Sequence, residues 1–374
     1  MSLFKRSVVS EVASHGGVVF STLIVVWLSV LLVRLLGQAA SGNIGADVVL
    51  GLAVFSSITA LPVILAVSLF IAVLATVTRN YRESEMVVWF ASGLSLKNWL
   101  NPVLRCAVPV AALIAVLTLV ASPWAYRQIE EYRERYAQRS DLSKVTAGQF
   151  IETEGGNRVF FAEEPTNADD ELGKVIARVK DQEWLSVVTA ESARIESQEN
   201  GDRFLVLSSG HRYDLKPGKA EFRMIDFESY GIRLENRNDD NSPESIRQRA
   251  ENSIKARPTS YLLTDDNDNS RSQIMWRLAL PLAALNLALL AIPLGAVNPR
   301  LGKSGDFLLA GLVGLLYMNL INLSRGWIRS GVLEFHLGVW LVHVLFAGLV
   351  AFLFWRRLRV RKPREQQDPA PGPA

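Results

Sequence analysis

The chain has 374 residues, of which 49% are hydrophobic and 21% are charged, and its formal net charge is +3. The charge is divided unevenly, because residues 123–272 hold 22 basic and 29 acidic side chains while the rest of the chain holds 18 and 8. The basic pI therefore reflects the apolar part of the chain and does not indicate nucleic acid binding. A single cysteine, Cys106, excludes an internal disulfide framework and a cysteine-based zinc site. The four histidines are not at metal-ligand spacing, so we expect no metal and no cofactor.

Six segments are long and apolar enough to cross a bilayer, which takes about 20 residues each. They run roughly over 17–36, 48–77, 99–120, 274–297, 306–323 and 335–355. The first follows Lys5 and Arg6, as a signal peptide would, but no small-residue cleavage site follows a short apolar core. We therefore expect it to be retained, which gives two membrane regions, 1–122 and 273–355.

The positions of lysine and arginine orient these spans, because basic residues accumulate on the cytoplasmic side. With six spans, the N-terminus, the loop after span two, the loop after span four and the tail 356–374 all fall on one side, and all are basic. We predict an inner-membrane protein with both termini in the cytoplasm and with residues 123–272 in the periplasm. The end of the tail is expected to be disordered.

The block between spans three and four has three parts. Residues 123–144 are expected to continue span three as a charged helix, with Glu131 and Arg135 at helical spacing. Residues 145–235 show strand patterning with turn signals between the runs, which predicts a sandwich or jelly roll. The expected strands are 158–162, 174–179, 186–196, 203–207, 211–215 and 220–234. Residues 236–272 are polar and are predicted to be a linker.

The fold class that follows is an α-helical membrane protein of six transmembrane helices with an inserted all-β, jelly-roll-like periplasmic domain. Within that domain, Phe160, Phe204 and Phe222 have two interpretations. They either form an ordinary core or line an open interior that acyl chains enter. The edge strands of such a domain are also able to pair with another chain.

Three arginines lie where spans meet the outer membrane surface. Arg34 is near the outer end of span one, and Arg325 and Arg329 are at the outer end of span five. One interpretation is interfacial anchoring, in which the side chain extends toward the lipid headgroups. The other is contact with an anionic lipid headgroup, since the planar guanidinium matches phosphate.

The cytoplasmic segment 79–96 is too short and too polar to span the membrane and is predicted to be an amphipathic helix. Glu83 and Glu85 lie near its start, where the helix dipole favours carboxylates. It is either an interfacial helix or a coupling helix that inserts into a cytoplasmic motor, where a glutamate would pair with a basic residue.

We expect no catalytic residues in this chain. Gly302-Lys303-Ser304 imitates the end of a phosphate-binding loop, but the glycine that this loop requires five residues earlier is replaced by Val297. An intramembrane hydrolase would need Ser324 with His336 or His343, and no nucleophile motif supports that set.

The order of several motifs resembles the lipopolysaccharide export permease family, LptF/LptG (YjgP/YjgQ), over residues 1–355. They are Leu32-Val33-Arg34-Leu35-Leu36-Gly37, Glu83-Ser84-Glu85, Ser92-Gly93-Leu94-Ser95, Ala147-Gly148-Gln149-Phe150, Trp276-Arg277-Leu278 and, most specific, Ile292-Pro293-Leu294 followed by Val297-Asn298-Pro299-Arg300-Leu301-Gly302-Lys303. The Asn-Pro-Arg turn and the Glu-Ser-Glu segment are more similar to the F-type subunit than to the G-type subunit.

The resemblance implies a non-catalytic half-transporter. An F-type and a G-type permease would form a heterodimer, bind two copies of a cytoplasmic ABC ATPase and extract lipopolysaccharide from the inner membrane. Their β domains would pass the lipid to an LptC-type periplasmic or bitopic protein. The family's cavity arginine falls on Arg34 and its coupling glutamate on Glu85, with Glu83 second. A second basic residue three positions before the arginine is Leu31 here, which departs from the family pattern.

A different class of function is also open. In that hypothesis the protein is a membrane-anchored interaction or sensor protein, the strand block binds a periplasmic partner, and the spans serve only as an anchor. Substitution of Arg34 would then have no effect, whereas deletions in the strand block would.

Overall fold

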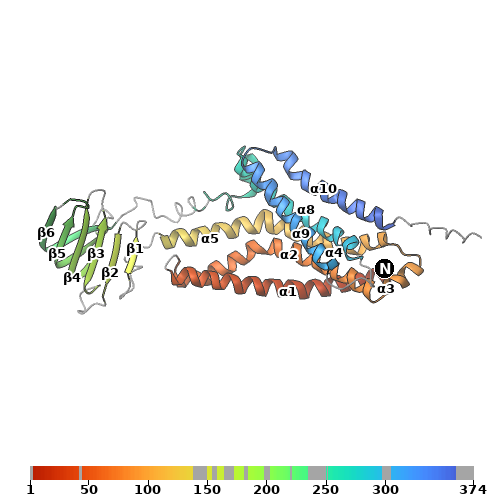
Figure 1. Ribbon diagram of the computed structural model, residues 1–374, viewed down its shortest axis with the longest axis horizontal. Coiled ribbons are helices and arrows are strands. Elements are labelled where there is room, and N and C mark those ends of the chain that lie inside the picture. The colour runs from red at the N-terminus through yellow and green to blue at the C-terminus, as the bar shows by residue number, and fades with distance from the viewer. Residues whose placement is uncertain are drawn as a thin grey trace, which may run out of the picture. The chain divides into compact units, whose positions relative to one another are not determined.

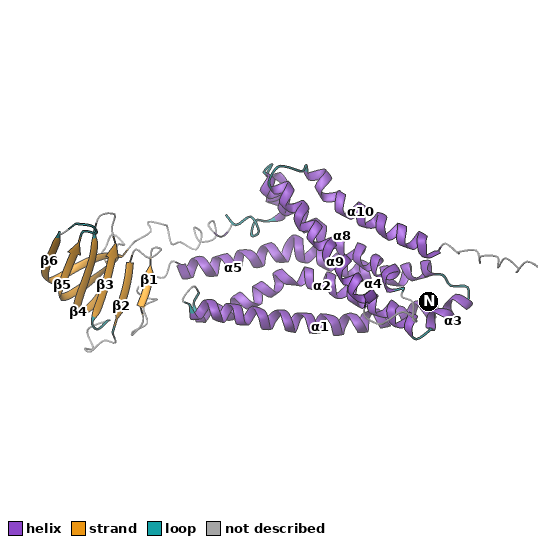
Figure 2. Ribbon diagram, viewed as in Figure 1, coloured by secondary structure: helices purple, strands orange, loops and turns teal. Residues whose placement is uncertain are grey.

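The computed structural model describes residues 3–41, 44–137, 150–153, 158–163, 172–180, 184–197, 203–219, 221–234, 250, 252–296 and 305–358. The chain divides into two compact units. A helical unit is formed by residues 1–41, 46–130 and 250–374, and a β unit by residues 42–45 and 131–249. The described strands all belong to the β unit (Figures 1 and 2).

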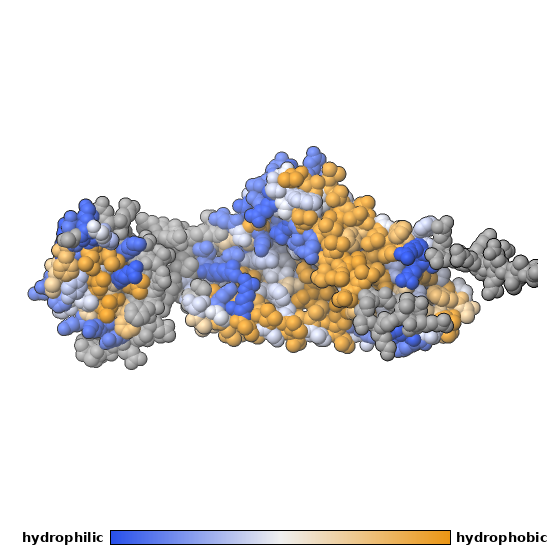
Figure 3. Space-filling model, in the orientation of Figure 1, coloured by the Kyte–Doolittle hydropathy of each residue, from blue (hydrophilic) through white to orange (hydrophobic). Residues whose placement is uncertain are grey.

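Six helices are long and apolar enough to cross a membrane, as the sequence predicts. Five of them are α1 (Leu3–Ala40), α2 (Val49–Arg82, preceded by the short helix η1, Ala46–Val48), α8 (Asp268–Gly295), α9 (Gly305–Arg329) and α10 (Phe335–Leu358). The remaining span is built from η2 (Leu96–Trp99), α4 (Leu100–Val116), the π-helical turn η3 (Leu117–Ala121) and α5 (Ser122–Ala137). Apolar side chains cover much of the visible face of the helical unit (Figure 3).

The third span is 41 residues long in its apolar and charged parts together. A helix of that length extends about 60 Å, twice the bilayer core. Its last part, α5, is accordingly charged, and Arg135 pairs with Glu131 one turn earlier at 3.5 Å. The helix that carries the chain out of the bilayer therefore continues as a polar stem.

The amphipathic helix predicted over residues 79–96 is shorter in the structure. The last turn of the long α2 contains Arg79, and the separate helix α3 covers only Glu85–Ala91. The break lies at Ser84, whose φ of 64° is left-handed and therefore cannot continue a helix. Gly93, with φ of 84°, ends the segment after α3.

The centre of the helical unit is α8, which packs against α2, α4, α9 and α10. Its buried face is rich in alanine, and small residues let neighbouring helices approach closely. In α8 61% of the most apolar stretch is buried, against 11% in α1 and 22% in α9. The most apolar stretches of α1 and α9 are therefore largely exposed in this chain.

The β unit contains one antiparallel sheet with the strand order β1 to β6, so each strand pairs with its neighbour in sequence. The strands are β1 (Phe150–Thr153), β2 (Arg158–Ala162), β3 (Val175–Lys180), β4 (Leu185–Ser197), β5 (Arg203–Leu215) and β6 (Phe222–Leu234). The expected all-β insertion between spans three and four is confirmed. The two runs predicted at 203–207 and 211–215 are one strand, β5.

A bend in the three long strands gives this single sheet an interior. Ser209 has φ of 48°, and the pairing of β5 with both neighbours is interrupted there. At the adjacent Gly210, a Cβ atom would lie 2.0 Å from the carbonyl oxygen of Thr189 and 2.7 Å from the ring of Phe227. Only glycine therefore fits at the bend. The buried apolar cluster of the β unit consists of Ala162, Val175, Ala177, Val188, Ala190, Ala193, Leu205, Leu207 and Ile232.

A polar network crosses the inside of the bend. Asp214 accepts hydrogen bonds of 2.7 Å from Ser186 Oγ and from Arg212 Nε, and Arg212 Nη1 donates to the hydroxyl of Tyr230 at 2.6 Å. Burial alone would raise the pKa of Asp214, but these hydrogen bonds and the charges of Arg212 and Arg223 outweigh it, so the pKa lies below its ordinary value. Arg212 pairs with Ile225 in the register. Its contact with Tyr230, five residues farther along β6, is possible because the sheet is folded.

Candidate functional site

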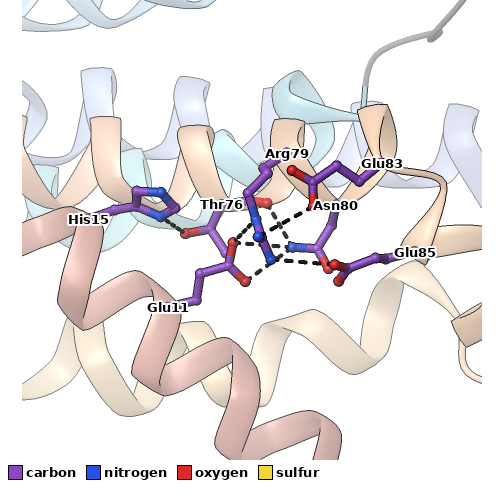
Figure 4. Close-up of polar contacts among 7 residues, drawn as sticks. All are labelled: Glu11, His15, Thr76, Arg79, Asn80, Glu83 and Glu85. Atoms are coloured by element: carbon purple, nitrogen blue, oxygen red, sulfur yellow. Dashed lines mark hydrogen bonds and ion pairs between the residues drawn. The ribbon is translucent and has the colours of Figure 1, made fainter.

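A cluster of charged side chains joins α1, the end of α2 and the start of α3 (Figure 4). Arg79 lies in the last turn of α2, and its guanidinium contacts three carboxylates. Its Nε is 2.5 Å from Glu11 on α1, its Nη1 is 3.3 Å from Glu83, and its Nη2 is 3.5 Å from Glu85. One cation thus connects the first helix to the segment that was predicted to couple with a motor.

The α1 side of this cluster is the better buried. The side chain of Glu11 is only 15% exposed, and its carboxylate also accepts a hydrogen bond of 3.2 Å from the buried Asn80. One helical turn after Glu11, His15 shares a 3.0 Å hydrogen bond with Thr76 on α2. Two successive turns of α1 are therefore fastened to α2 by polar contacts (Figure 4).

The α3 side remains accessible. The side chains of Glu83 and Glu85 are about half exposed, and three carboxylates around one guanidinium leave the cluster negative. Val87, Val88 and Phe90 on α3 are exposed as well, although each is a large apolar residue. A short helix that offers both carboxylates and apolar side chains to its surroundings is suited to bind a basic, grooved partner.

The three arginines predicted at the other end of the bundle differ in their contacts within this chain. Arg34 on α1 is exposed and makes no hydrogen bond or ion pair with any described residue. On α9, Arg325 donates to the side-chain oxygen of Gln273 at 2.6 Å, and Arg329 donates to that of Asn269 at 3.0 Å. The latter two therefore both contact α8, while Arg34 stands apart.

Comparison with known proteins identifies the family. The sequence profile described as "Lipopolysaccharide export system permease LptF/LptG" matches residues 6–356. The chain is 28% identical to the lipopolysaccharide export system permease protein LptF of Escherichia coli (strain K12) over 364 residues, which is 96% of each protein. It is equally similar, over the same lengths, to LptF of Shigella flexneri.

The chain belongs to the LptF/LptG family of lipopolysaccharide export permeases. Together with the six spans, the family supports a multi-pass protein of the inner membrane with a permease role in lipopolysaccharide transport. The Glu-Ser-Glu segment and Arg34 lie in an LptF/LptG-family chain whose alignment covers 96% of the E. coli LptF sequence. The Asn-Pro-Arg turn at 298–300 lies outside the described residues.

The residues considered for a membrane hydrolase have other partners in this permease. Ser324 donates to the main-chain oxygen of Gly338 at 2.8 Å. His343 is bonded through Nδ1 to the hydroxyl of Tyr317 at 2.6 Å, and Asn286 donates to that hydroxyl at 2.9 Å. The serine and the histidine are therefore each hydrogen-bonded to other groups, and the family is one of permeases.

Of the phenylalanines proposed for an acyl-chain path in the β unit, Phe204 and Phe222 do not belong to its buried cluster. Phe222 is 58% exposed on β6, and Phe204 is partly buried beside Gly231. The side chain of Phe160 lies outside the described part of the chain. Strand β6 is an edge of the described sheet and exposes Met224 and Ile225 as well as Phe222.

Sequence reasoning missed Glu11 and Arg79 as parts of the site. The only sequence feature that could have indicated the site is the spacing of Glu11 and His15, one helical turn apart at the start of an apolar helix. In the structure both side chains contact α2. Their partners are 61 to 69 residues away in sequence. Charge patterns within a single helix do not reveal such contacts.

Proposed function

We propose that this LptF/LptG-family permease is the F-type half of a heterodimer with a G-type permease, driven by two copies of a cytoplasmic ABC ATPase. The complex extracts lipopolysaccharide from the inner membrane. Both termini and α3 face the cytoplasm, and the β unit lies in the periplasm. The basic loops and tail support this orientation.

The observation that carries the proposal is the exposed, acidic and apolar helix α3 with its attachment to α1 through Arg79. The ATPase binds α3, with Glu85 as the main ion-pair partner and Glu83 as the second. Because Arg79 also binds Glu11, a displacement of α3 moves the ends of α1 and α2 together. The nucleotide cycle would in this way reshape the lipid cavity between the permeases.

The membrane part offers two further elements of this role. The most apolar stretches of α1 and α9 are the least buried of the six, which leaves apolar surface for a second permease. Arg34, Arg325 and Arg329 lie toward the periplasmic end, where they contact the anionic headgroup of the lipid. Arg34 is the least engaged of the three within this chain.

The β unit passes the lipid onward, past Phe160, Phe204 and Phe222, to an LptC-type protein. In support of this route, β6 is an edge strand of the described sheet and half of its main-chain groups have no partner strand there. Strand addition by another chain is the recognition mode that such an edge favours.

The decisive test is the charge reversal Glu85→Lys in the full-length permease. We expect loss of the ATPase from the purified complex and loss of transport-dependent growth, while the permease itself remains folded and membrane-inserted. Glu334→Lys is the matched control, since it reverses an exposed carboxylate at the opposite end of the helical unit. If Glu85→Lys recovers as much ATPase as the wild type, α3 is not the coupling element.

A further inference from the structure

A cavity of about 220 Å³ lies inside the helical unit at the end opposite α3. It is bordered by α1, α2, η3, α5, α8 and α9 and by the segment before α7 (Thr259–Thr264). Its walls are both basic and aromatic, with Trp27, Tyr126, Lys255, Trp276, Arg277 and Arg325. The volume is below the 300–1,000 Å³ or so of pockets for drug-sized ligands, so it accommodates a single small group.

Among the described residues, the three cations of this cavity contact neutral groups. Arg277 is 2% exposed, and its guanidinium donates to Thr259 Oγ1 at 2.6 Å and to the main-chain oxygens of Arg257 and Lys255 at 2.8 and 3.2 Å. Arg325 donates to an amide oxygen and lies over the ring of Trp276. Lys255 lies over the ring of Tyr126. Within the described ranges none of the three contacts a carboxylate, although burying an unpaired charge is costly.

Two prolines fix the frame of the cavity. Pro123 and Pro281 have no N–H, so the carbonyl oxygens four residues earlier, on Leu119 and Arg277, lose their helical donors. Threonine hydroxyls take the place of the missing N–H donors. Thr259 donates to the Leu119 oxygen at 2.6 Å, and Thr118 donates to the Arg277 oxygen at 3.0 Å.

The same Thr259 hydroxyl accepts the hydrogen bond from Arg277, so the guanidinium is held in place by a chain of bonds that begins at a proline. The π-helical turn η3 lies at this point, and such turns are often found at functional sites. The cavity is therefore rigid and positively charged before any ligand arrives, which favours binding.

We propose that this cavity binds a phosphate monoester, with Arg325 and Lys255 contacting the phosphate oxygens and Arg277 supplying buried positive charge behind them. Arginine and phosphate are matched in geometry, and the bond is charge-assisted. The phosphate could belong to a lipid headgroup or to free phosphate. That the headgroup is that of the exported lipid rests on the proposed function, whereas the phosphate chemistry does not.

The test measures binding to the purified full-length permease in uncharged detergent. Radiolabelled dihexanoyl phosphatidic acid supplies a lipid phosphate monoester, inorganic phosphate supplies the free ion, and dihexanoyl phosphatidylcholine supplies a diester control. The variant combines Arg325→Gln with Lys255→Gln and keeps Arg277, so that the frame remains intact. The matched control is Arg271→Gln, which removes a charge on α8 that pairs with Asp266 and Asp268.

We expect saturable binding of phosphatidic acid to the wild type, weakened at least about tenfold in the double variant and within about twofold of wild type in the control. If the wild type binds phosphatidic acid but not inorganic phosphate, the source of the phosphate is a lipid. If it binds both equally, the ligand is the free ion. Three results would overturn the proposal. In the first, the wild type binds neither phosphatidic acid nor inorganic phosphate. In the other two, the double variant binds phosphatidic acid as tightly as the wild type does, or the wild type binds phosphatidylcholine as tightly as phosphatidic acid. Because ATPase recruitment by α3 is measured separately, such a failure would leave the proposed transport function standing.

Discussion

Replacing Arg79 by alanine should weaken the attachment of α3 to α1 by an amount that the geometry bounds. The contact with Glu11 is a charge-assisted hydrogen bond of 2.5 Å to a side chain that is 15% exposed, worth about 1.5–3 kcal/mol. The pairs with Glu83 and Glu85 are longer and solvent-exposed, worth about 0.2–1 kcal/mol each. We therefore expect a loss of about 2–5 kcal/mol in the free energy of unfolding.

A double-mutant cycle isolates the Glu11 contact. Arg79→Ala, Glu11→Ala and the double variant are unfolded with sodium dodecyl sulfate in mixed micelles, and tryptophan fluorescence reports the transition. The two substitutions should be coupled by at least about 1 kcal/mol. Lys97→Ala combined with Glu11→Ala is the control, because Lys97 is exposed on η2 and makes no contact with a described carboxylate.

The same variants test how the cluster acts in the complex. Arg79→Ala should retain the ATPase, since Glu85 remains available, but should lower lipid-stimulated ATP hydrolysis because α3 no longer moves α1. Additive effects of Arg79→Ala and Glu11→Ala, within about 0.3 kcal/mol, would refute the attachment. Normal lipid stimulation in Arg79→Ala would refute its role in coupling.

Three further predictions concern the β unit and the membrane core. Since the pKa of Asp214 in the folded state lies below its ordinary value of about 3.9, its stabilising effect is present above that pH and is lost as the pH falls through the folded-state value. Thermal unfolding of the β unit in the full-length protein should therefore be more acid-sensitive in the wild type than in Asp214→Asn, and parallel pH profiles would exclude this role. Gly210→Ala should destabilise the β unit by at least about 2 kcal/mol. Gly231→Ala is the control, because its Cβ would be 3.6 Å from its nearest neighbour, and it should cost under about 1 kcal/mol. Equal protease resistance of the two variants would contradict the requirement for glycine at the bend. Ser324→Ala should lose only one hydrogen bond, about 1 kcal/mol, and keep full transport in a lipid-release assay, whereas loss of transport at normal expression would reopen the question of a catalytic serine.

The membrane helices are predictable because a bilayer span needs a continuous apolar stretch. The ends of these helices are less predictable. For example, α1 begins at Leu3 although its apolar stretch begins near residue 17. Glu11 and His15 lie in the part of α1 before that apolar stretch and contact α2, and hydropathy does not register such contacts. In α3 the charged and apolar residues were recognised, but the left-handed Ser84 that separates it from α2 has no sequence signal that distinguishes it from a helical serine.

In the β unit, the alternation of residues predicts strands but not how one strand continues through a bend. Residues 203–215 look like two strands because Ser208, Ser209 and Gly210 interrupt the pattern, and the structure uses them as a kink inside one strand. Long-range partners are the least predictable feature. Glu83 and Glu85 were found from their position near a helix start, whereas the pairing of Arg277 with the segment before α7 depends on tertiary contacts alone.

We propose above all that this permease works as one half of an ATPase-driven lipopolysaccharide exporter. The most direct test is to tag the chain at its C-terminus, purify it from native membranes in mild detergent, and identify the co-purifying proteins and lipids by mass spectrometry. We expect an ABC ATPase, a second six-span permease of the same family and bound lipopolysaccharide, with the ATPase lost in Glu85→Lys. Recovery of the chain with only periplasmic proteins and ordinary phospholipid would contradict the account and favour a membrane-anchored sensor.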